Sequence, residues 1–330
     1  MHVKWVALWL VLGMACSDDS GLTPDRGSDV GGDLSIYPDG PVPEQGPRDP
    51  DIAVGPDIGP VDGGAPVAGK WVKVTAGTFK MGSLTGEPCR DSTDETQHDV
   101  TLTRDFEIWS HEVTQTEFEA AMGYNPSYRK TCGLTCPVEN LNWSEAASFC
   151  NGLSQKKGLT SCYSCSGSKA AVTCSVDPAY SGIYSCPGYR LPTDAEWEYA
   201  YRAGSTTSLY NGNLPATNCS AADPGADAIG WYSKNSGGTT HPVGQKTPNA
   251  WGLYDMAGNA QEWVNDLRVA DLGSDAATDP LGGTTGNQGV IRGGSFAHSA
   301  EDLRAAHRKQ QTLKNIGTSL GFRCARSLIP

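Results

Sequence analysis

Residues 189–200 read YRLPTDAEWEYA and carry the clearest helix start in the chain. Thr193 stands three places before Glu196, and large aromatic residues follow. This spacing is typical of a capping box, in which each side chain accepts a hydrogen bond from the other residue's backbone N–H. It predicts a short helix after Thr193 that ends at Gly204, because glycine favours the left-handed turn of a helix C-terminus.

The same pattern occurs twice upstream. Thr114 precedes Glu117, and Asn142 precedes Glu145, each with the three-residue spacing and with apolar residues beyond. Both pairs are capping boxes, so the sequence predicts two more short helices.

Short alternating runs precede these helices. Residues 72–74 and residues 78–83 flank Gly77, and together they predict a β-hairpin with its turn at that glycine. Residues 100–103 predict a further strand. After Gly204 periodicity fades, and small and polar residues dominate to the C-terminus. We therefore expect one loop-rich α+β domain over residues 70–330.

Residues 1–16, MHVKWVALWLVLGMAC, have the composition of a secretion signal. Lys4 is followed by about eleven apolar residues, whereas a membrane-spanning helix needs about 20. Cys16 follows Gly13 and Ala15 in a pattern that resembles a bacterial lipobox, in which the cysteine receives lipid. We expect an exported lipoprotein, anchored in the membrane through Cys16 at the outer membrane or periplasmic face. An ordinary signal peptide cut after Ala15, and hence secretion, is the alternative.

Residues 17–69 have a composition unsuited to folding. They hold nine prolines, eleven glycines and a net charge of −9. Such a segment cannot bury enough surface to offset its chain entropy, so we expect a disordered acidic tether. The whole chain carries −12 and Lys4 contributes one positive charge, which leaves −4 for residues 70–330. This mild acidity, without any basic block, argues against nucleic acid as a partner.

The chain has eleven cysteines, and ten remain if Cys16 carries lipid. An even number in an exported protein indicates disulfides. Cys132 and Cys136 are spaced for a small local loop. Four more cysteines lie in one Ser/Gly-rich insertion and are expected to pair among themselves, with a zinc site as the alternative. These four are Cys162, Cys165, Cys174 and Cys186.

Several strings follow one another in a recognisable order along the domain. Together they resemble the formylglycine-generating enzyme (sulfatase-modifying factor) family over about residues 70–327. The resemblance implies that family's variant of the C-type-lectin-like fold, an α+β fold rich in loops. The strings are GTFKMGS (77–83), EVT (112–114), PV (137–138), NWSEA (142–146), YRLPTDAEWEYA (189–200), HPVG (241–244), NAWGLYDMAGN (249–259), EW (262–263), RGGS (292–295) and GFRC (321–324).

Family enzymes oxidise a sulfatase cysteine to Cα-formylglycine with oxygen, and they hold copper(I) between two cysteines after the Arg-Gly-Gly-Ser motif. Two thiolates suit copper(I) and leave room for a substrate thiol. Ser295 of the motif is present, but the resemblance puts His298 and Leu303 at the cysteine positions and Ser299 at a histidine position. Leucine cannot ligate a metal. These residues therefore argue against copper and against formylglycine generation, and indicate a pseudoenzyme.

The resemblance also implies a calcium loop. It assigns side-chain ligands to Asp255 and Glu262 and main-chain carbonyls to Gly258 and Ala260, which are the hard oxygens that calcium prefers. From the residues alone, Asp255 and Asn259 could equally make turn hydrogen bonds. A second family calcium site would fall at Asn218, Cys219, Asn235 and Gly237.

The family pattern implies a disulfide between Cys150 and Cys324, which leaves Cys89 with Cys219. Another branch of the superfamily uses iron on three histidines, and the domain has five histidines with no helical metal-ligand spacing. His298 and His307 are the pair of interest, because both lie on the terminal loop. The five are His98, His111, His241, His298 and His307.

Three functional hypotheses follow. The first is a non-catalytic, calcium-stabilised binding or scaffolding domain with a protein or glycan ligand. The second is an oxidoreductase that uses His298 with Ser295 or Arg304. The third is formylglycine generation with an unconventional thiol, Cys219. Four tryptophans are expected to pack in the core, with a carbohydrate platform as the alternative; they are Trp197, Trp231, Trp251 and Trp263.

Overall fold

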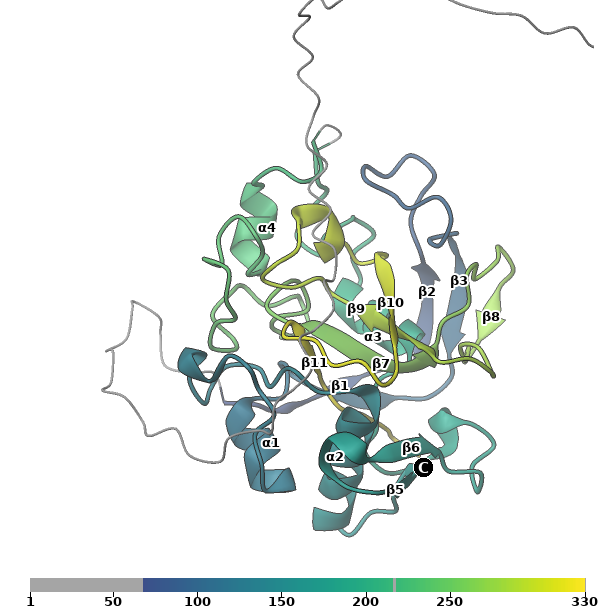
Figure 1. Cartoon of the computed structure of the whole chain (residues 1–330). Coiled ribbons are helices and arrows are strands. Elements are labelled where there is room, and N and C mark those ends of the chain that lie inside the picture. The colour runs from purple at the N-terminus through teal and green to yellow at the C-terminus, as the bar shows by residue number, and fades with distance from the viewer. Residues whose placement is uncertain (1–67, 216–217, 330) are drawn as a thin grey trace, which may run out of the picture. The chain divides into compact units, whose positions relative to one another are not determined.

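The computed structural model describes residues 68–215 and 218–329 (Figure 1). The expected signal peptide (1–16), the lipidation site Cys16 and all but the last two residues of the expected tether (17–69) lie outside the described residues. In the part that the structure describes, no helix combines the length and the apolar character that crossing a membrane requires.

Helices and strands alternate irregularly along the domain, as an α+β fold requires. The α-helices are α1 (Gln115–Met122), α2 (Trp143–Lys156), α3 (Asp194–Arg202) and α4 (Pro224–Ile229), and a 3-10 turn η4 spans Ala300–Leu303. The strands are β1 (Trp71–Val74), β2 (Gly77–Met81), β3 (His98–Leu102), β4 (Phe106–Trp109), β5 (Tyr163–Ser166), β6 (Thr173–Val176), β7 (Gln261–Leu267), β8 (Ala277–Thr278), β9 (Gln288–Arg292), β10 (Arg308–Thr312), β11 (Leu320–Phe322) and β12 (Ala325–Ser327).

The three capping boxes are confirmed. Thr114, Asn142 and Thr193 each accept a hydrogen bond from the backbone N–H three residues on, and the glutamate there bonds back to the cap. The end of α3 differs slightly from the expectation. Ala203, one residue before the predicted Gly204, already takes the left-handed conformation, with a φ of 44°.

The predicted hairpin across Gly77 is wrong, although both of its strands exist. β1 pairs with β4, and β2 pairs with β3, so the two runs enter different sheets. The chain crosses between the sheets at Ala76, whose N–H donates to the Asp105 carboxylate at 2.9 Å. That contact is long-range, and a local alternation pattern cannot reveal it.

The core sheet has the order β10-β9-β7-β11, with β7 antiparallel to β9 and parallel to β11. β7 is almost entirely buried, and Trp263 on it is fully enclosed. Figure 1 shows β7 and β9 at the centre of the domain beside α3. Two further three-stranded sheets have the orders β1-β4-β12 and β2-β3-β8, and β5 and β6 form a two-stranded ribbon against α2.

Five disulfides join the ten cysteines of the domain. Cys150 on α2 is bonded to Cys324 beside β12, the pairing that the family resemblance implied. Within the Ser/Gly-rich insertion the pairs are Cys162–Cys186 and Cys165–Cys174, so these four residues are not zinc thiolates in this structure. The remaining pairs are Cys132–Cys136 and Cys89–Cys219.

Candidate functional site

The Arg-Gly-Gly-Ser motif begins at the end of β9. The Arg292 guanidinium is buried and bonds to Asp194 and Glu198 of α3, and it also donates to the Ala305 carbonyl at 2.8 Å. Gly294 has a φ of 67°, and a Cβ there would lie 2.9 Å from the Asp302 carbonyl oxygen. Arg292 therefore holds the loop after β9 against α3 and the segment that contains η4. A glycine is needed at position 294, where the backbone of this loop comes close to the Asp302 carbonyl.

The four residues of the expected degenerate site follow this clamp. Ser295 is fully buried, and its Oγ lies 2.6 Å from Nδ1 of the half-buried His298. Ser299 is the N-cap residue of η4, and its backbone N–H and its Oγ donate to the Asp302 carboxylate at 3.1 Å and 2.8 Å. Leu303 is fully buried in the hydrophobic core, and its carbonyl accepts from the Tyr201 hydroxyl at 2.6 Å. The structure thus brings the four residues together on one loop, in packing and capping roles.

His307 lies near this loop but does not form a metal site with His298. Its Nδ1 contacts the Asp302 carbonyl at 3.1 Å. Burial lowers the pKa of His307, which favours the neutral ring. Although burial opposes it, His307, Lys309 and His298 hold the pKa of Asp302 well below its ordinary value. The Asp302 carboxylate is therefore ionised and organises the loop by charge.

The Asp255–Glu262 loop enters the core sheet. Asp255 has a φ of 54° and is buried, and its Oδ2 accepts from the Gly244 N–H at 2.7 Å. Its Oδ1 is buried without a hydrogen-bond partner. Glu262, the second residue of β7, accepts from the Arg323 guanidinium at 2.6 Å and from the Trp197 indole N–H at 2.9 Å. Burial raises the pKa of Asp255 to about 6.

A third buried carboxyl group, which sequence reasoning missed, belongs to this loop. Glu112 accepts from the Ala260 N–H and from the Asn259 amide, each at 2.7 Å. Burial, and after it the charges of Asp255 and Glu262, raise the pKa of Glu112 well above its ordinary value. Its position in the Glu-Val-Thr string was visible in the sequence, but nothing in the sequence tied that string to the loop.

These three carboxyl groups face one common cation, Arg323. Three ionised carboxylates against one guanidinium would leave two uncompensated buried charges, an arrangement that is costly without a counterion. The orphaned Asp255 Oδ1 and this charge excess fit a hard divalent ion such as Ca²⁺, whereas each Glu262 oxygen already accepts two contacts from Arg323 and Trp197. Asp255, Glu262 and the carbonyls of Gly258 and Ala260 are the groups that would hold it.

The second expected calcium position offers a poorer donor set. Asn218 is exposed, and Cys219 is in a disulfide. The Asn235 amide donates to Asp227 and to the Gly230 carbonyl and accepts from the Tyr232 N–H. Gly237 is exposed on the same turn, with a φ of 64°. None of these side chains leaves a buried oxygen unpaired, so the observations that favour Ca²⁺ at Asp255 have no counterpart here.

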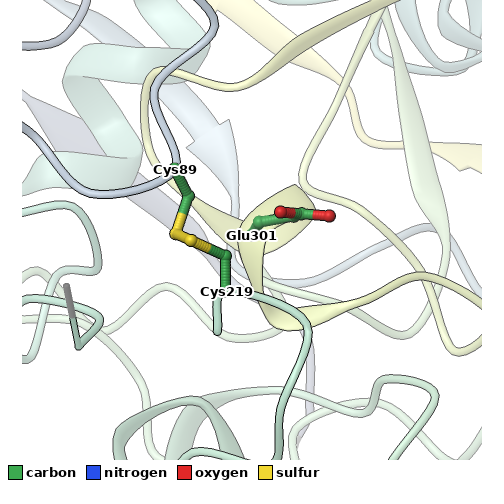
Figure 2. Close-up of side chains that lie close together, drawn as sticks. All are labelled: Cys89, Cys219 and Glu301. Carbon is green, nitrogen blue, oxygen red and sulfur yellow. A yellow bond between two sulfur atoms is a disulfide. The ribbon is translucent and has the colours of Figure 1, made fainter. Parts of the chain in front are cut away.

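The sequence paired Cys89 with Cys219 only because the other cysteines had been assigned. In the structure a third side chain lies beside this pair. The Glu301 carboxylate lies beside the disulfide, and Figure 2 shows the three side chains together. Among residues 68–215 and 218–329, this is the one group of three or more His, Cys, Asp or Glu side chains close enough to share an ion. Glu301 lies inside the 298–303 loop, so the cluster adjoins the expected degenerate site.

The four tryptophans divide into two pairs. Trp197 and Trp263 are fully buried, as core packing requires. Trp231 is half-buried and stacks on His241 at a centroid distance of 3.8 Å. Trp251, also half-buried, meets Tyr199 edge-on at 5.1 Å and lines a cavity of about 530 Å³ together with Phe79.

Comparison with known proteins identifies the class to which this fold and loop belong. Residues 64–328 match the sulfatase-modifying factor enzyme 1-like domain. The chain is therefore a member of the formylglycine-generating enzyme (sulfatase-modifying factor) family, as its ordered motifs indicated.

Individual relatives differ in what their names describe. The chain is 33% identical to chaperone protein LppX of Paenibacillus barcinonensis over 192 residues, which is 50% of this chain and 62% of that protein. It is 32% identical to the formylglycine-generating enzyme of Bos taurus over 163 residues, 43% of this chain and 40% of that protein. It thus spans less than two thirds of either one. Among solved structures it resembles Treponema denticola variable protein 1, with a TM-score of 0.66 and 31% identity over 78% of this chain and 94% of that one.

Proposed function

We propose that this family domain is a non-catalytic binding or scaffolding domain, stabilised by Ca²⁺ and displayed on the cell envelope through a lipid on Cys16. The observation that carries the proposal is Leu303. It occupies the place that the family resemblance gives to the second copper-binding cysteine, and it is fully enclosed in the core. Ser295 and Ser299 on the same loop are engaged in local hydrogen bonds.

The burial of Leu303 also bears on substrate access. A thiol substrate needs access to the reacting centre, and a buried leucine provides neither access nor a ligand. Oxygen consumption measured with a sulfatase-derived cysteine peptide tests this directly, and we expect none.

Calcium binding at the Asp255–Glu262 loop is the second part of the proposal. It is supported by the unpaired Asp255 Oδ1 and by the excess of buried carboxylates over the single Arg323. Isothermal titration with Ca²⁺ after chelation should show saturable binding that Asp255→Ala abolishes. Calcium binding that survives in this variant would show that the ion binds at another site.

For the ligand we propose a glycan at the cavity between β2 and α3. Phe79, Tyr199 and Trp251 line it with half-buried rings, and Thr78, Gln97 and Thr206 add polar groups around them. Aromatic faces beside hydrogen-bonding groups suit the apolar and hydroxyl faces of a sugar ring.

Binding of the purified domain to an oligosaccharide array tests this surface. Trp251→Ala should weaken any glycan that binds by about tenfold, the order expected for losing one aromatic contact. Trp231→Ala is the matched control, because Trp231 is also half-buried but stacks on His241 elsewhere. Equal losses in both variants, or no glycan bound at all, would contradict the assignment.

One observation favours an oxidoreductase as a second candidate. The Ser295 hydroxyl and the His298 ring lie 2.6 Å apart, and His298 is partly accessible. A metal-loaded protein that loses its iron or copper on His298→Ala would support this candidate. Elemental analysis that finds neither metal would reject it.

A further inference from the structure

Cys89, Cys219 and Glu301 come from three separate segments of the chain. Cys89 lies on the loop between β2 and β3, Cys219 on the loop before α4, and Glu301 on η4. The disulfide has a Cα–Cα distance of 5.8 Å, and each residue places a ligand-type atom within 4.8 Å of the other two. All three residues are partly exposed.

We propose that two-electron reduction of the Cys89–Cys219 disulfide opens a zinc site formed by the two thiolates and the Glu301 carboxylate. Zn²⁺ accepts sulfur and carboxylate ligands together and is commonly held tetrahedrally by three protein ligands and one water. The disulfide form offers no thiolate, so redox state decides whether the site exists. This inference does not depend on the proposed binding function.

The loop that carries Cys89 is fastened to η4 independently of the disulfide. The buried Arg304 guanidinium, one residue after η4, donates to Glu95 at 2.7 Å through each of two nitrogens and to Glu87 at 3.1 Å. Glu87 and Glu95 flank Cys89 on its loop. Cys89 should therefore stay near Glu301 after reduction.

Two other contacts prepare the remaining ligands. The Ser299 hydroxyl shares its single proton between the Asp302 carboxylate at 2.8 Å and the Glu301 carboxylate at 3.0 Å, so it contacts Glu301 as an outer-shell partner does in metal sites. On the Cys219 side, the Asp223 N–H donates to the hydroxyl of the buried Tyr232 at 3.0 Å. That bond anchors the loop of Cys219 at its far end.

Exposure and neighbours distinguish this disulfide from the other four. Cys150–Cys324 and Cys162–Cys186 are fully buried, so a reductant cannot reach them in the folded domain. Cys165–Cys174 is more accessible, and Cys132 is partly exposed although Cys136 is buried. No third ligand group in the described residues lies close enough to share an ion with either of these two pairs. Among the described residues, only reduction at Cys89–Cys219 creates three convergent ligands.

The chemistry balances with a dithiol as the reductant. A dithiol thiolate attacks one sulfur to give a mixed disulfide, and its second thiol then releases the protein as two thiols and leaves as a cyclic disulfide. The two electrons and two protons come from the dithiol. Zn²⁺ then displaces the two thiol protons, because thiolates, not thiols, bind metal.

The test measures metal uptake by the purified full-length protein before and after mild reduction with a phosphine, which supplies the same two electrons without itself adding a thiol. Alkylation and mass spectrometry identify which cysteines are free. We expect no zinc in the oxidised protein and one equivalent after reduction, and Co²⁺ in its place should give the near-ultraviolet absorption of thiolate-to-metal charge transfer.

Three variants make the result specific. Glu301→Gln should weaken zinc by at least about tenfold, since even outer-shell groups contribute that much. Cys89→Ser with Cys219→Ser should abolish zinc uptake, whereas Cys132→Ser with Cys136→Ser should leave zinc uptake unchanged.

The proposal is overturned if free Cys89 and Cys219 thiols take up no zinc, if Glu301→Gln binds zinc as tightly as wild type, or if this disulfide resists reduction until the domain unfolds. Equal affinity in Glu301→Gln would instead indicate a two-thiolate site.

Discussion

At the scale of single residues, Leu303 and Asp255 carry most of the argument. Leu303 is a hydrophobic side chain in the core, at a position where the family resemblance implies a metal thiolate. Asp255 is a buried carboxylate with one oxygen unpaired. We propose that Leu303 excludes metal–thiolate chemistry at its position and that Asp255 contributes to a cation site.

Replacing Leu303 should reveal a packing role. We expect Leu303→Ala to lower the free energy of unfolding by about 3 kcal/mol, because a fully buried leucine loses its contacts and leaves a cavity. His298→Ala, on the same loop but partly exposed, should cost about 1 kcal/mol or less. Urea denaturation of both variants gives the comparison, and equal costs would contradict the packing role of Leu303.

Asp255 makes a pH-dependent prediction. Burial raises its pKa from 3.8 to about 6, so between these values the folded chain binds more protons than the unfolded chain. In the presence of a chelator, the free energy of unfolding should therefore fall as pH rises from about 4 to about 6, by about 3 kcal/mol from this group. The loss is complete above about pH 6, where the buried carboxylate is ionised.

Two comparisons isolate this contribution from other titrating groups. Asp255→Asn should remove it from the pH profile measured with chelator, because the amide does not ionise. Saturating Ca²⁺ should remove it from the wild-type profile, because the ion pairs with the carboxylate. Superimposable profiles for wild type and Asp255→Asn in chelator would show that Asp255 is not the group responsible.

At the scale of elements, the sequence predicted the helices well and the sheets poorly. Capping boxes are local, so Thr114, Asn142 and Thr193 could be recognised from a three-residue spacing. The pairing of β1 with β4 and of β2 with β3 depends on distant partners, so a local hairpin was predicted in error. β7 is buried on both faces and does not alternate, which hid the centre of the core sheet.

The candidate site also has residues that local motifs predicted and residues that only long-range contacts reveal. Asp255, Glu262 and the loop after Arg292 were identified through ordered motifs, which record family relationships. Glu112 and Glu301 could not be assigned, because each meets its partners through segments more than 80 residues away in sequence. Glu112 meets its charged neighbours, and Glu301 meets the Cys89–Cys219 pair, only in the three-dimensional structure.

The disulfides give a prediction at this scale. Cys150–Cys324 spans 174 residues, whereas Cys132–Cys136 spans 4. In the chain-entropy model, removing the long link by a double serine substitution should cost about 5 kcal/mol, and removing the short one about 2 kcal/mol. Thermal denaturation of the two double variants should rank them in this order. The reverse order would mean that strain or residual structure, not loop closure, dominates.

At the scale of the whole molecule, the family fold keeps its internal supports, and we propose that its inherited reaction centre is lost. The Arg292 clamp, the core sheet and the buried carboxylates around Arg323 remain. The loop that they support contains a serine–histidine contact, a capping serine and a buried leucine. Such a domain is suited to presenting a stable surface.

The most direct test of this claim is the mass spectrum of a sulfatase-derived cysteine peptide incubated with the full-length protein, copper(I) and oxygen. The account predicts an unchanged cysteine and no oxygen uptake above the peptide-free control. Conversion of the cysteine to formylglycine, even in a single turnover per chain, would contradict it.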